Sequence, residues 1–226
     1  MKIKQKISLI SSISLFISFI LWTVLVKFVD VKPIGPNGSS VGFSTLNGAF
    51  HTLTGTNMTL YVITDWLGLV AIGVAFGFAL LGLVQLIKRK SLFKVDRSII
   101  ILGIFYIAVM ACYIFFEYVV INYRPVLIEG YLEASYPSST TMLVACVIPT
   151  AMMQLKRLLK NKVLGVTVLS LLAAFTVFMI VGRTISGVHW ISDIIGGMLI
   201  SASLVSAYYF AASQDDQKPC LKCKFN

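Results

Sequence analysis

Charged side chains are scarce in this sequence. They make up 12% of its 226 residues, whereas soluble globular domains carry about 25%. Hydrophobic residues reach 58%, and the mean hydropathy is +0.89. This composition excludes a separate soluble domain and indicates a single integral membrane domain across residues 1–226.

Acidic residues are scarcer still, with nine against 19 lysines and arginines, so the formal net charge is +10. An excess of positive charge is one sign of nucleic-acid binding. Here, however, the basic residues gather at the ends of apolar runs, which is typical of membrane topology signals and not of a nucleic-acid groove. We therefore expect membrane lipids as partners and no nucleic acid.

Metal-ligating residues are also few, with four cysteines and two histidines. Cys112 and Cys146 fall inside apolar runs, where small core residues are expected. Cys220 and Cys223 form one CxxC in a lysine-rich tail, which is weak evidence for zinc without a second ligand pair. A flexible tail open to lipid modification is the favoured interpretation. We expect neither a metal nor another cofactor.

Six apolar segments approach the roughly 20 residues that a helix needs to cross a bilayer. They cover residues 8–28, 60–87, 98–122, 138–155, 163–182 and 190–212, and residues 213–226 follow as a tail. The sequence thus predicts an all-α, polytopic membrane protein with six transmembrane helices. The first segment is too long for a signal peptide and lacks an obvious cleavage site, which favours an anchoring helix.

Lysine and arginine mark one side of this arrangement. Fifteen of the 19 precede the first span, follow the sixth, or lie between spans two and three or four and five. The positive-inside rule makes that side cytoplasmic. Both termini are expected in the cytoplasm, and the connections near Arg124 and Arg183 outside it.

One long connection, residues 30–59, is expected on the outer side. Its middle, residues 41–53, is semi-apolar. Two interpretations remain open: a segment that lies along the membrane interface or closes as a lid, and a plain surface loop. His51 is expected to be a solvated loop residue.

Arg183, His189 and Asp193 form an Arg-x5-His-x3-Asp string between the last two spans. A helix from Trp190 onward would put His189 and Asp193 on one face, so that the carboxylate accepts the proton of one ring nitrogen. The other nitrogen is then free to attack. Arg183 offers a planar fork of donors suited to phosphate.

Two further motifs belong to the same outer side. Tyr123-Arg124-Pro125 closes span three, and Pro137-Ser138-Ser139-Thr140 opens span four. A helix N-terminus with small hydroxyl residues is an anion site. Each motif alone has a simpler interpretation. Arg124 and Arg183 would be ordinary interfacial arginines, and Pro137-Ser138-Ser139 would be only a helix cap. Together, the motifs fit an oxyanion held for in-line attack by His189.

These motifs resemble the type 2 phosphatidic acid phosphatase (PAP2) superfamily, which includes vanadium-dependent haloperoxidases. Its motifs are Lys-x6-Arg-Pro, Pro-Ser-Gly-His and Ser-Arg-x5-His-x3-Asp, and the resemblance covers residues 98–212. It implies a PAP2/haloperoxidase-like helical core in which His189 becomes phosphohistidine and Asp193 orients it. Arg124 and Arg183 would bind the phosphoryl oxygens. The predicted phosphate cradle consists of Ser138, Ser139 and Thr140.

The chain departs from these motifs at three positions. Gly182 replaces the serine of the third motif. Glu117 replaces the lysine of the first and, two turns before Arg124 on the expected helix, would brace that arginine. Thr140 replaces the histidine that protonates the leaving group, and a threonine hydroxyl is no acid at neutral pH. General acid catalysis contributes about 10²–10⁴-fold, so a diphosphate, which loses a stable anion, is the favoured substrate.

The sequence therefore predicts a lipid phosphate or diphosphate phosphatase with an extracytoplasmic site. Undecaprenyl diphosphate is the first expected substrate, followed by phosphatidic acid or phosphatidylglycerol phosphate. The alternative is an impaired member that binds or transports lipid phosphates, as Thr140 and Glu117 suggest. Asp65, near the outer end of span two, is a weaker candidate. Glu129 and Glu133 are expected to shape the pocket mouth or to pair with a basic residue.

Overall fold

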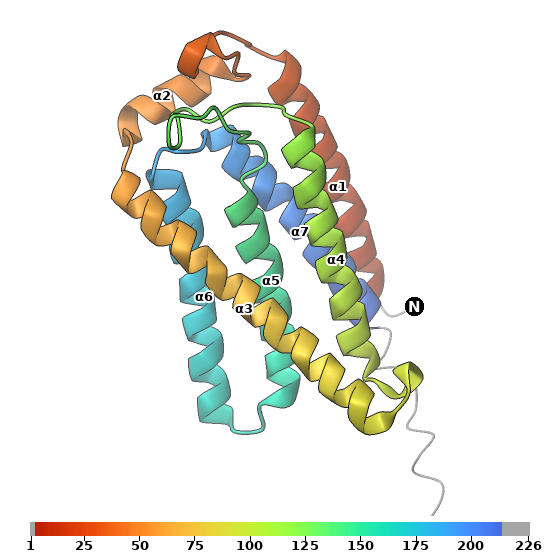
Figure 1. Cartoon of the computed structure of the whole chain (residues 1–226). Helices are drawn as coiled ribbons and strands as arrows, with labels where there is room; N and C mark the ends of the chain where they lie inside the picture. Colours follow the sequence, from red (N-terminus) through yellow and green to blue (C-terminus); the bar gives the residue numbers. More distant parts are fainter. Residues whose placement is uncertain (1–2, 214–226) are drawn as a thin grey trace, which may run out of the picture.

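Six long helices dominate the structure, a computed structural model that describes residues 3–213. They are α1 (Ile3–Phe28), α3 (Met58–Arg89), α4 (Arg97–Tyr118), α5 (Ser139–Leu158), α6 (Lys162–Ile185) and α7 (Ile191–Ser213). The connections hold a shorter helix, α2 (Ser44–Thr54), and two 3-10 turns, η1 (Pro36–Gly38) and η2 (Leu92–Lys94). Each predicted apolar segment falls on one long helix (Figure 1), so the all-α prediction is confirmed for residues 3–213. The predicted tail, with Cys220 and Cys223, lies outside the described residues.

The first and last helices pack side by side (Figure 1) through small hydroxyl side chains. Ser12 Oγ donates to the Ser203 carbonyl at 3.0 Å, and Ser203 Oγ donates to the Ser12 carbonyl at 2.9 Å. About one helical turn away, Ser8 Oγ donates to the Ser206 carbonyl at 2.7 Å. Small residues let the two backbones approach closely, and their hydroxyls find partners that lipid does not offer. Helix α1 is therefore an integral part of the bundle.

Helix α5 occupies the centre of the bundle and packs against α3, α4, α6 and α7. Within residues 3–213, the other five long helices are apolar and long enough to cross a membrane, and α5 falls short in hydropathy. Its polar side chains are satisfied inside the protein: Thr150 Oγ1 donates to the Cys146 carbonyl at 2.8 Å, and the Gln154 amide donates to the Tyr208 hydroxyl. The modest hydropathy of α5 thus reflects its enclosure by other helices rather than contact with lipid.

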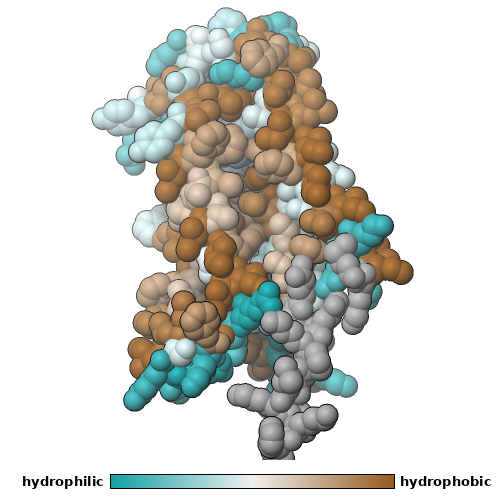
Figure 2. All heavy atoms as spheres, turned by 90° about the vertical axis from the view of Figure 1, so that its right-hand side faces the viewer, coloured by the Kyte–Doolittle hydropathy of each residue, from teal (hydrophilic) through white to brown (hydrophobic). Residues whose placement is uncertain are grey.

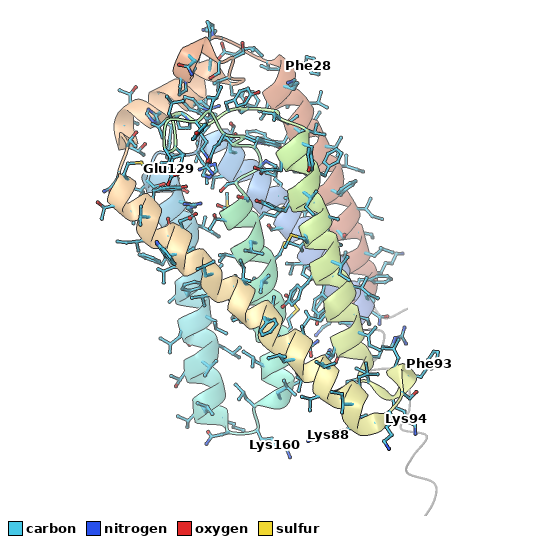
Figure 3. The ribbon with its side chains drawn as sticks, in the orientation of Figure 1. Phe28, Lys88, Phe93, Lys94, Glu129 and Lys160 are labelled. Atoms are coloured by element: carbon cyan, nitrogen blue, oxygen red, sulfur yellow. The ribbon has the colours of Figure 1, made fainter. Side chains whose placement is uncertain are left out.

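The two ends of the bundle are polar, and their charges differ. On the face shown in Figure 2, hydrophobic side chains form a band between hydrophilic patches at both ends. Lys88, Lys94 and Lys160 gather at one end (Figure 3), although they come from two separate connections. Glu129 lies toward the opposite end. The structure thus brings the basic connections of spans two to three and four to five together, as the sequence predicted.

The long connection between α1 and α3 folds over the end of the bundle opposite these lysines (Figure 1). Its helix α2 is tied down by Asn47, which is fully buried. Asn47 Nδ2 donates to the Gly42 carbonyl at 2.7 Å, and its Oδ1 accepts from the backbone N–H of Ser192 at 3.1 Å. The segment is therefore anchored to the start of α7. This argues against a loose surface loop and against a lid that moves freely.

Candidate active site

A polar cavity lies between segments from different parts of the chain. They include the loop 119–138 with the first turn of α5, which follows it directly, and the end of α6 with the turn to α7. Glu129, in the loop, marks this end of the bundle in Figure 3. The cavity has a volume of about 590 Å³. Arg124, Arg183 and His189 all line it, so the structure brings the three predicted segments together.

The imidazole of His189 is only 3% exposed and is held at both nitrogens. Nδ1 lies 3.1 Å from the backbone carbonyl of Ser135 and 3.0 Å from its hydroxyl, and Nε2 lies 3.2 Å from Nη1 of Arg124. Because a carbonyl only accepts, these partners assign the proton to Nδ1. The lone pair on Nε2 then faces Arg124, in the cavity, which is the orientation a nucleophile requires.

Burial lowers the pKa of His189 well below its ordinary value, and the positive charges of Arg124 and Arg183 lower it further. At neutral pH the ring is therefore uncharged. A neutral imidazole keeps the Nε2 lone pair available for attack.

Asp193 does not contact His189, contrary to the sequence prediction. Helix α7 begins at Ile191, so His189 precedes the helix and does not share its face. The Ser135 hydroxyl lies between the two residues and donates to Asp193 Oδ2 at 2.5 Å. The same oxygen accepts from the backbone N–H of Trp190 at 3.1 Å, so Asp193 also caps the first turn of α7. Asn122 Nδ2 donates to Oδ1 at 3.2 Å. The carboxylate therefore acts on His189 through Ser135.

Arg183 is 1% exposed and is held from three sides. Its Nη2 donates to Asp65 Oδ1 at 3.0 Å and to Thr140 Oγ1 at 2.5 Å, and its guanidinium lies 4.9 Å from the ring centroid of Tyr61. Its Nε is buried and has no hydrogen-bond partner among residues 3–213. Buried donors are nearly always paired in folded proteins, so this N–H is an exception within a residue that lines the cavity.

Arg124 pairs with a different carboxylate from the one predicted. Its Nε lies 3.0 Å from Oε2 of Glu133, and its guanidinium lies 5.7 Å from the Tyr61 ring centroid. The predicted partner, Glu117, is not on a common helix with Arg124 because α4 ends at Tyr118. Glu117 lines the same cavity but has no ion-pair partner in the described part of the chain. Glu133 thus takes the role of pairing with a basic residue.

Only part of the predicted phosphate cradle faces the cavity. Ser139 and Thr140 line it, at the first turn of α5 where backbone N–H groups lack helical partners. Ser138 does not line it, which corrects the prediction. The N–H of Ser138 donates to the Asp193 carbonyl at 3.1 Å, and its hydroxyl donates to Thr141 at 3.0 Å. Ser138 therefore joins α5 to α7.

The comparisons with known proteins agree with this geometry. Residues 104–215 match the family model described as PAP2 superfamily. The region of residues 104–215, which carries all three motifs, belongs to the PAP2 superfamily. Among solved structures, it is similar to the crystal structure of a transmembrane PAP2 type phosphatidylglycerolphosphate phosphatase from Bacillus subtilis. The TM-score is 0.53 at 18% identity, over 94% of this chain and 99% of that chain. A search of curated proteins found no match. The resemblance predicted from the motifs is thereby confirmed, and at this identity the structural likeness concerns the fold.

One departure from the PAP2 motifs has a steric explanation. A Cβ atom at Gly182 would lie 2.8 Å from Cγ2 of Thr64, which is closer than such atoms approach in proteins. Helices α3 and α6 meet at this point, so the serine of the PAP2 third motif does not fit opposite Thr64. Gly182 is therefore a consequence of the packing between these two helices.

His51 also differs from its prediction as a solvated loop residue. Its ring is half-buried, with the centroid 5.5 Å from that of Trp190, and its Nε2 lies 3.1 Å from the Gly187 carbonyl. His51 therefore packs against the turn between α6 and α7. His51 does not line the polar cavity of this PAP2 protein.

The polar cavity adjoins a second cavity, which in turn adjoins a third. A cavity of about 340 Å³ lies between α3, α4 and α5 and shares five lining residues with the polar cavity: Asp65, Tyr113, Ser139, Thr140 and Met142. A mainly apolar cavity of about 750 Å³ lies between α3 and α4 and shares Ile72 and Met110 with the second one. The second and third cavities thus form an apolar route of adjoining surfaces that begins near the arginines and follows α3 and α4.

Sequence reasoning missed several residues of the site. Ser135, Asn122 and Tyr61 contact the predicted residues, yet none belongs to a motif with a recognisable spacing. Asp65 is only a weak candidate in the sequence, but its carboxylate pairs with Arg183. The only available signal was the presence of an acidic residue inside an apolar segment.

Proposed function

We propose that this protein is a lipid phosphate or diphosphate phosphatase that works through a phosphohistidine intermediate. The observation that carries the proposal is the buried imidazole of His189, which lines the polar cavity and whose Nε2 lies 3.2 Å from Nη1 of Arg124. The guanidinium group of Arg183 belongs to a residue that lines the same cavity. A nucleophile beside two groups that bind oxyanions is the arrangement that phosphoryl transfer needs.

The reaction follows from these contacts. A phosphoryl group enters between the arginines and replaces the contact between Arg124 and Nε2. Nε2 attacks phosphorus while the Ser135 carbonyl holds Nδ1–H, and Asp193 stabilises the charged ring through the Ser135 hydroxyl. Arg124, Arg183 and the first N–H groups of α5 bind the phosphoryl oxygens. Water then hydrolyses the phosphohistidine.

The adjoining cavities support a lipid substrate. The second and third cavities are lined mainly by aliphatic and aromatic side chains of α3, α4 and α5. An acyl or prenyl chain attached to the bound phosphate would lie there. A small soluble phosphate ester would leave this apolar surface unused.

The distribution of charge supports an extracytoplasmic site. The positive-inside rule assigns the end with Lys88, Lys94 and Lys160 to the cytoplasm. The polar cavity then opens on the other side, where lipid phosphates of the outer leaflet are accessible, and both termini are cytoplasmic.

Thr140 bears on the choice of substrate. The family's leaving-group acid is absent at this position, and Thr140 instead accepts a hydrogen bond from Arg183. A diphosphate tolerates this loss because its leaving group is a stable phosphate anion. We therefore place undecaprenyl diphosphate first, and phosphatidic acid or phosphatidylglycerol phosphate second. Thr140 and the unpaired Glu117 favour the second candidate function, a lipid-phosphate binder without turnover.

Phosphate release by the detergent-purified protein tests the proposal. Undecaprenyl diphosphate and phosphatidic acid are offered separately to the native protein, His189→Ala and Thr140→His. Release by the native protein that is abolished in His189→Ala supports a phosphatase. If the native protein releases no phosphate and Thr140→His does, the native protein is an impaired enzyme. Silence of all three, combined with retained lipid-phosphate binding, supports the binder.

A further inference from the structure

Asp65 lies close to Thr140, the residue that replaces the histidine of the second PAP2 motif. Its Oδ1 and the hydroxyl of Thr140 both contact Nη2 of Arg183, at 3.0 Å and 2.5 Å. The two oxygens are therefore no farther apart than those two distances added together. Arg183 is sealed, with its side chain 1% exposed, whereas the side chain of Asp65 is 55% exposed. The carboxyl group is thus open to a ligand, although its partner is not.

Asp65 also lies where the leaving oxygen of a lipid substrate must pass. His189 lines the polar cavity and not the second cavity, so a phosphoryl group attacked by Nε2 directs its leaving group away from His189. If the chain of the substrate follows the apolar route, the bridging oxygen lies at the junction of these cavities. Asp65 is the one carboxylic acid among the residues that line both.

The other acids of the polar cavity are placed less well. Glu117 and Glu133 line the polar cavity and are not among the residues that line the second one. Glu133 is also paired with Arg124. Tyr113 does line both cavities, but a phenol is a much weaker acid than a carboxyl group.

From this position we infer that Asp65 is the catalytic acid and base of this protein, in place of the histidine that Thr140 replaces. The inference rests on the proposed function. It extends the substrate class from lipid diphosphates to lipid phosphate monoesters, whose alkoxide leaving group needs a proton.

Every proton of the reaction is accounted for when the substrate binds as a monoanion. Oδ2 of Asp65 takes the proton of the phosphate while Oδ1 stays at Nη2 of Arg183. The N–P bond to His189 then forms, the P–O bond to the lipid breaks, and Asp65 gives its proton to the leaving oxygen. In the second step water attacks phosphorus and passes one proton to Asp65, and the N–P bond breaks. Asp65 finally returns this proton to the departing phosphate.

A matched pair of substrates tests the inference: farnesyl phosphate and farnesyl diphosphate, which share one lipid chain and differ in the leaving group. The native protein is expected to hydrolyse both. Asp65→Asn keeps the shape of the side chain and removes the acid, so hydrolysis of the monoester should fall by about 10²–10⁴-fold. Hydrolysis of the terminal phosphate of the diphosphate should fall far less. Adding Thr140→His to Asp65→Asn should restore part of the monoester activity.

Two controls separate acid catalysis from structural effects. Glu129→Gln removes an exposed carboxylate that lines none of the cavities, and both activities should persist. Tyr113→Phe tests the rival acid at the junction. A loss selective for the monoester in Tyr113→Phe, and not in Asp65→Asn, would assign the role to Tyr113 and overturn the inference.

The remaining outcomes are also decisive. If Asp65→Asn lowers both activities equally, Asp65 only positions Arg183, and the inference fails while the proposed function stands. If the native protein cleaves the diphosphate and not the monoester, no acid operates and the inference again fails alone. A native protein that cleaves neither substrate and forms no phosphohistidine removes the proposed function, and this inference with it.

Discussion

Two walls of the polar cavity differ in how firmly their side chains are held. The buried wall consists of Ser135, Arg183 and His189, which are almost fully enclosed, and it is backed by the buried Asp193. Ser135 forms hydrogen bonds with both His189 and Asp193. The open wall consists of Asp65, Tyr113 and Glu117 on α3 and α4, which are exposed to the cavity. The buried wall contains the residues of the PAP2 third motif, and the open wall contains a carboxylate where the first motif has lysine. In the proposed function, the attacking histidine therefore lies in the enclosed wall, and the exposed side chains of the open wall are the ones that contact the rest of the substrate.

The largest expected effect comes from the buried wall. His189→Ala removes the nucleophile and should lower hydrolysis of undecaprenyl diphosphate by roughly 10⁴-fold or more. His51→Ala is the matched control, because the second histidine of the chain lies outside the cavity. Phosphate release measures both. If the two variants lose activity to the same extent, His189 has no special role.

Arg183→Lys tests the geometry of the same wall. A lysine keeps the positive charge but cannot contact Asp65, Thr140 and a phosphoryl oxygen at once. Loss of one donor to a developing oxyanion costs about 10²–10³-fold in turnover, and we expect a fall of that size in kcat. A variant with native kcat would show that charge alone is sufficient there.

Ser135→Ala tests whether Asp193 acts on His189 through the hydroxyl group of Ser135. It removes the hydroxyl between Asp193 and His189 but leaves the Ser135 carbonyl to hold Nδ1. We expect kcat to fall by about 10-fold, which is small beside general acid–base effects of 10²–10⁴-fold. Asp193→Asn should cost more, because Asp193 also caps α7. Equal kcat in Ser135→Ala and the native protein would contradict the relay.

The smallest expected change concerns stability behind the buried wall. Gly182→Ser restores the PAP2 motif but places a Cβ 2.8 Å from Thr64 Cγ2. Overpacking of this kind costs about 1–3 kcal/mol, so thermal unfolding in detergent should show a lower Tm. Adding Thr64→Ser removes the opposing methyl group and should recover most of the loss. A Gly182→Ser variant with unchanged Tm would refute the steric explanation.

The sequence anticipated the buried wall better than the open one, for a physical reason. Arg183 and His189 lie six residues apart, and a short string with strong chemical constraints identifies them directly. Ser135 and Tyr61 reach the site only through tertiary folding, so no local pattern reveals them. The expected partnership of Glu117 and Arg124 failed because hydropathy does not distinguish a helix from an apolar loop. Residues 119–122 continue the apolar run, but the helix ends at Tyr118.

The fold itself was largely predictable, because long apolar runs have few alternatives in a membrane. Each of the six runs falls on a long helix, and the PAP2 relationship is confirmed. Helix α5 shows where this logic weakens. Its enclosure by four neighbours relaxes the need for apolar side chains, so its hydropathy falls below that of the other five.

The most direct test of the account is a search for the covalent intermediate. The purified protein would be mixed briefly with undecaprenyl diphosphate labelled with ³²P on its terminal phosphate, quenched in alkali and digested for peptide mapping. The account predicts an alkali-stable, acid-labile label on the peptide that contains His189, and no label in His189→Ala. Steady release of phosphate without any labelled peptide, or a label on another residue, would contradict a mechanism through His189.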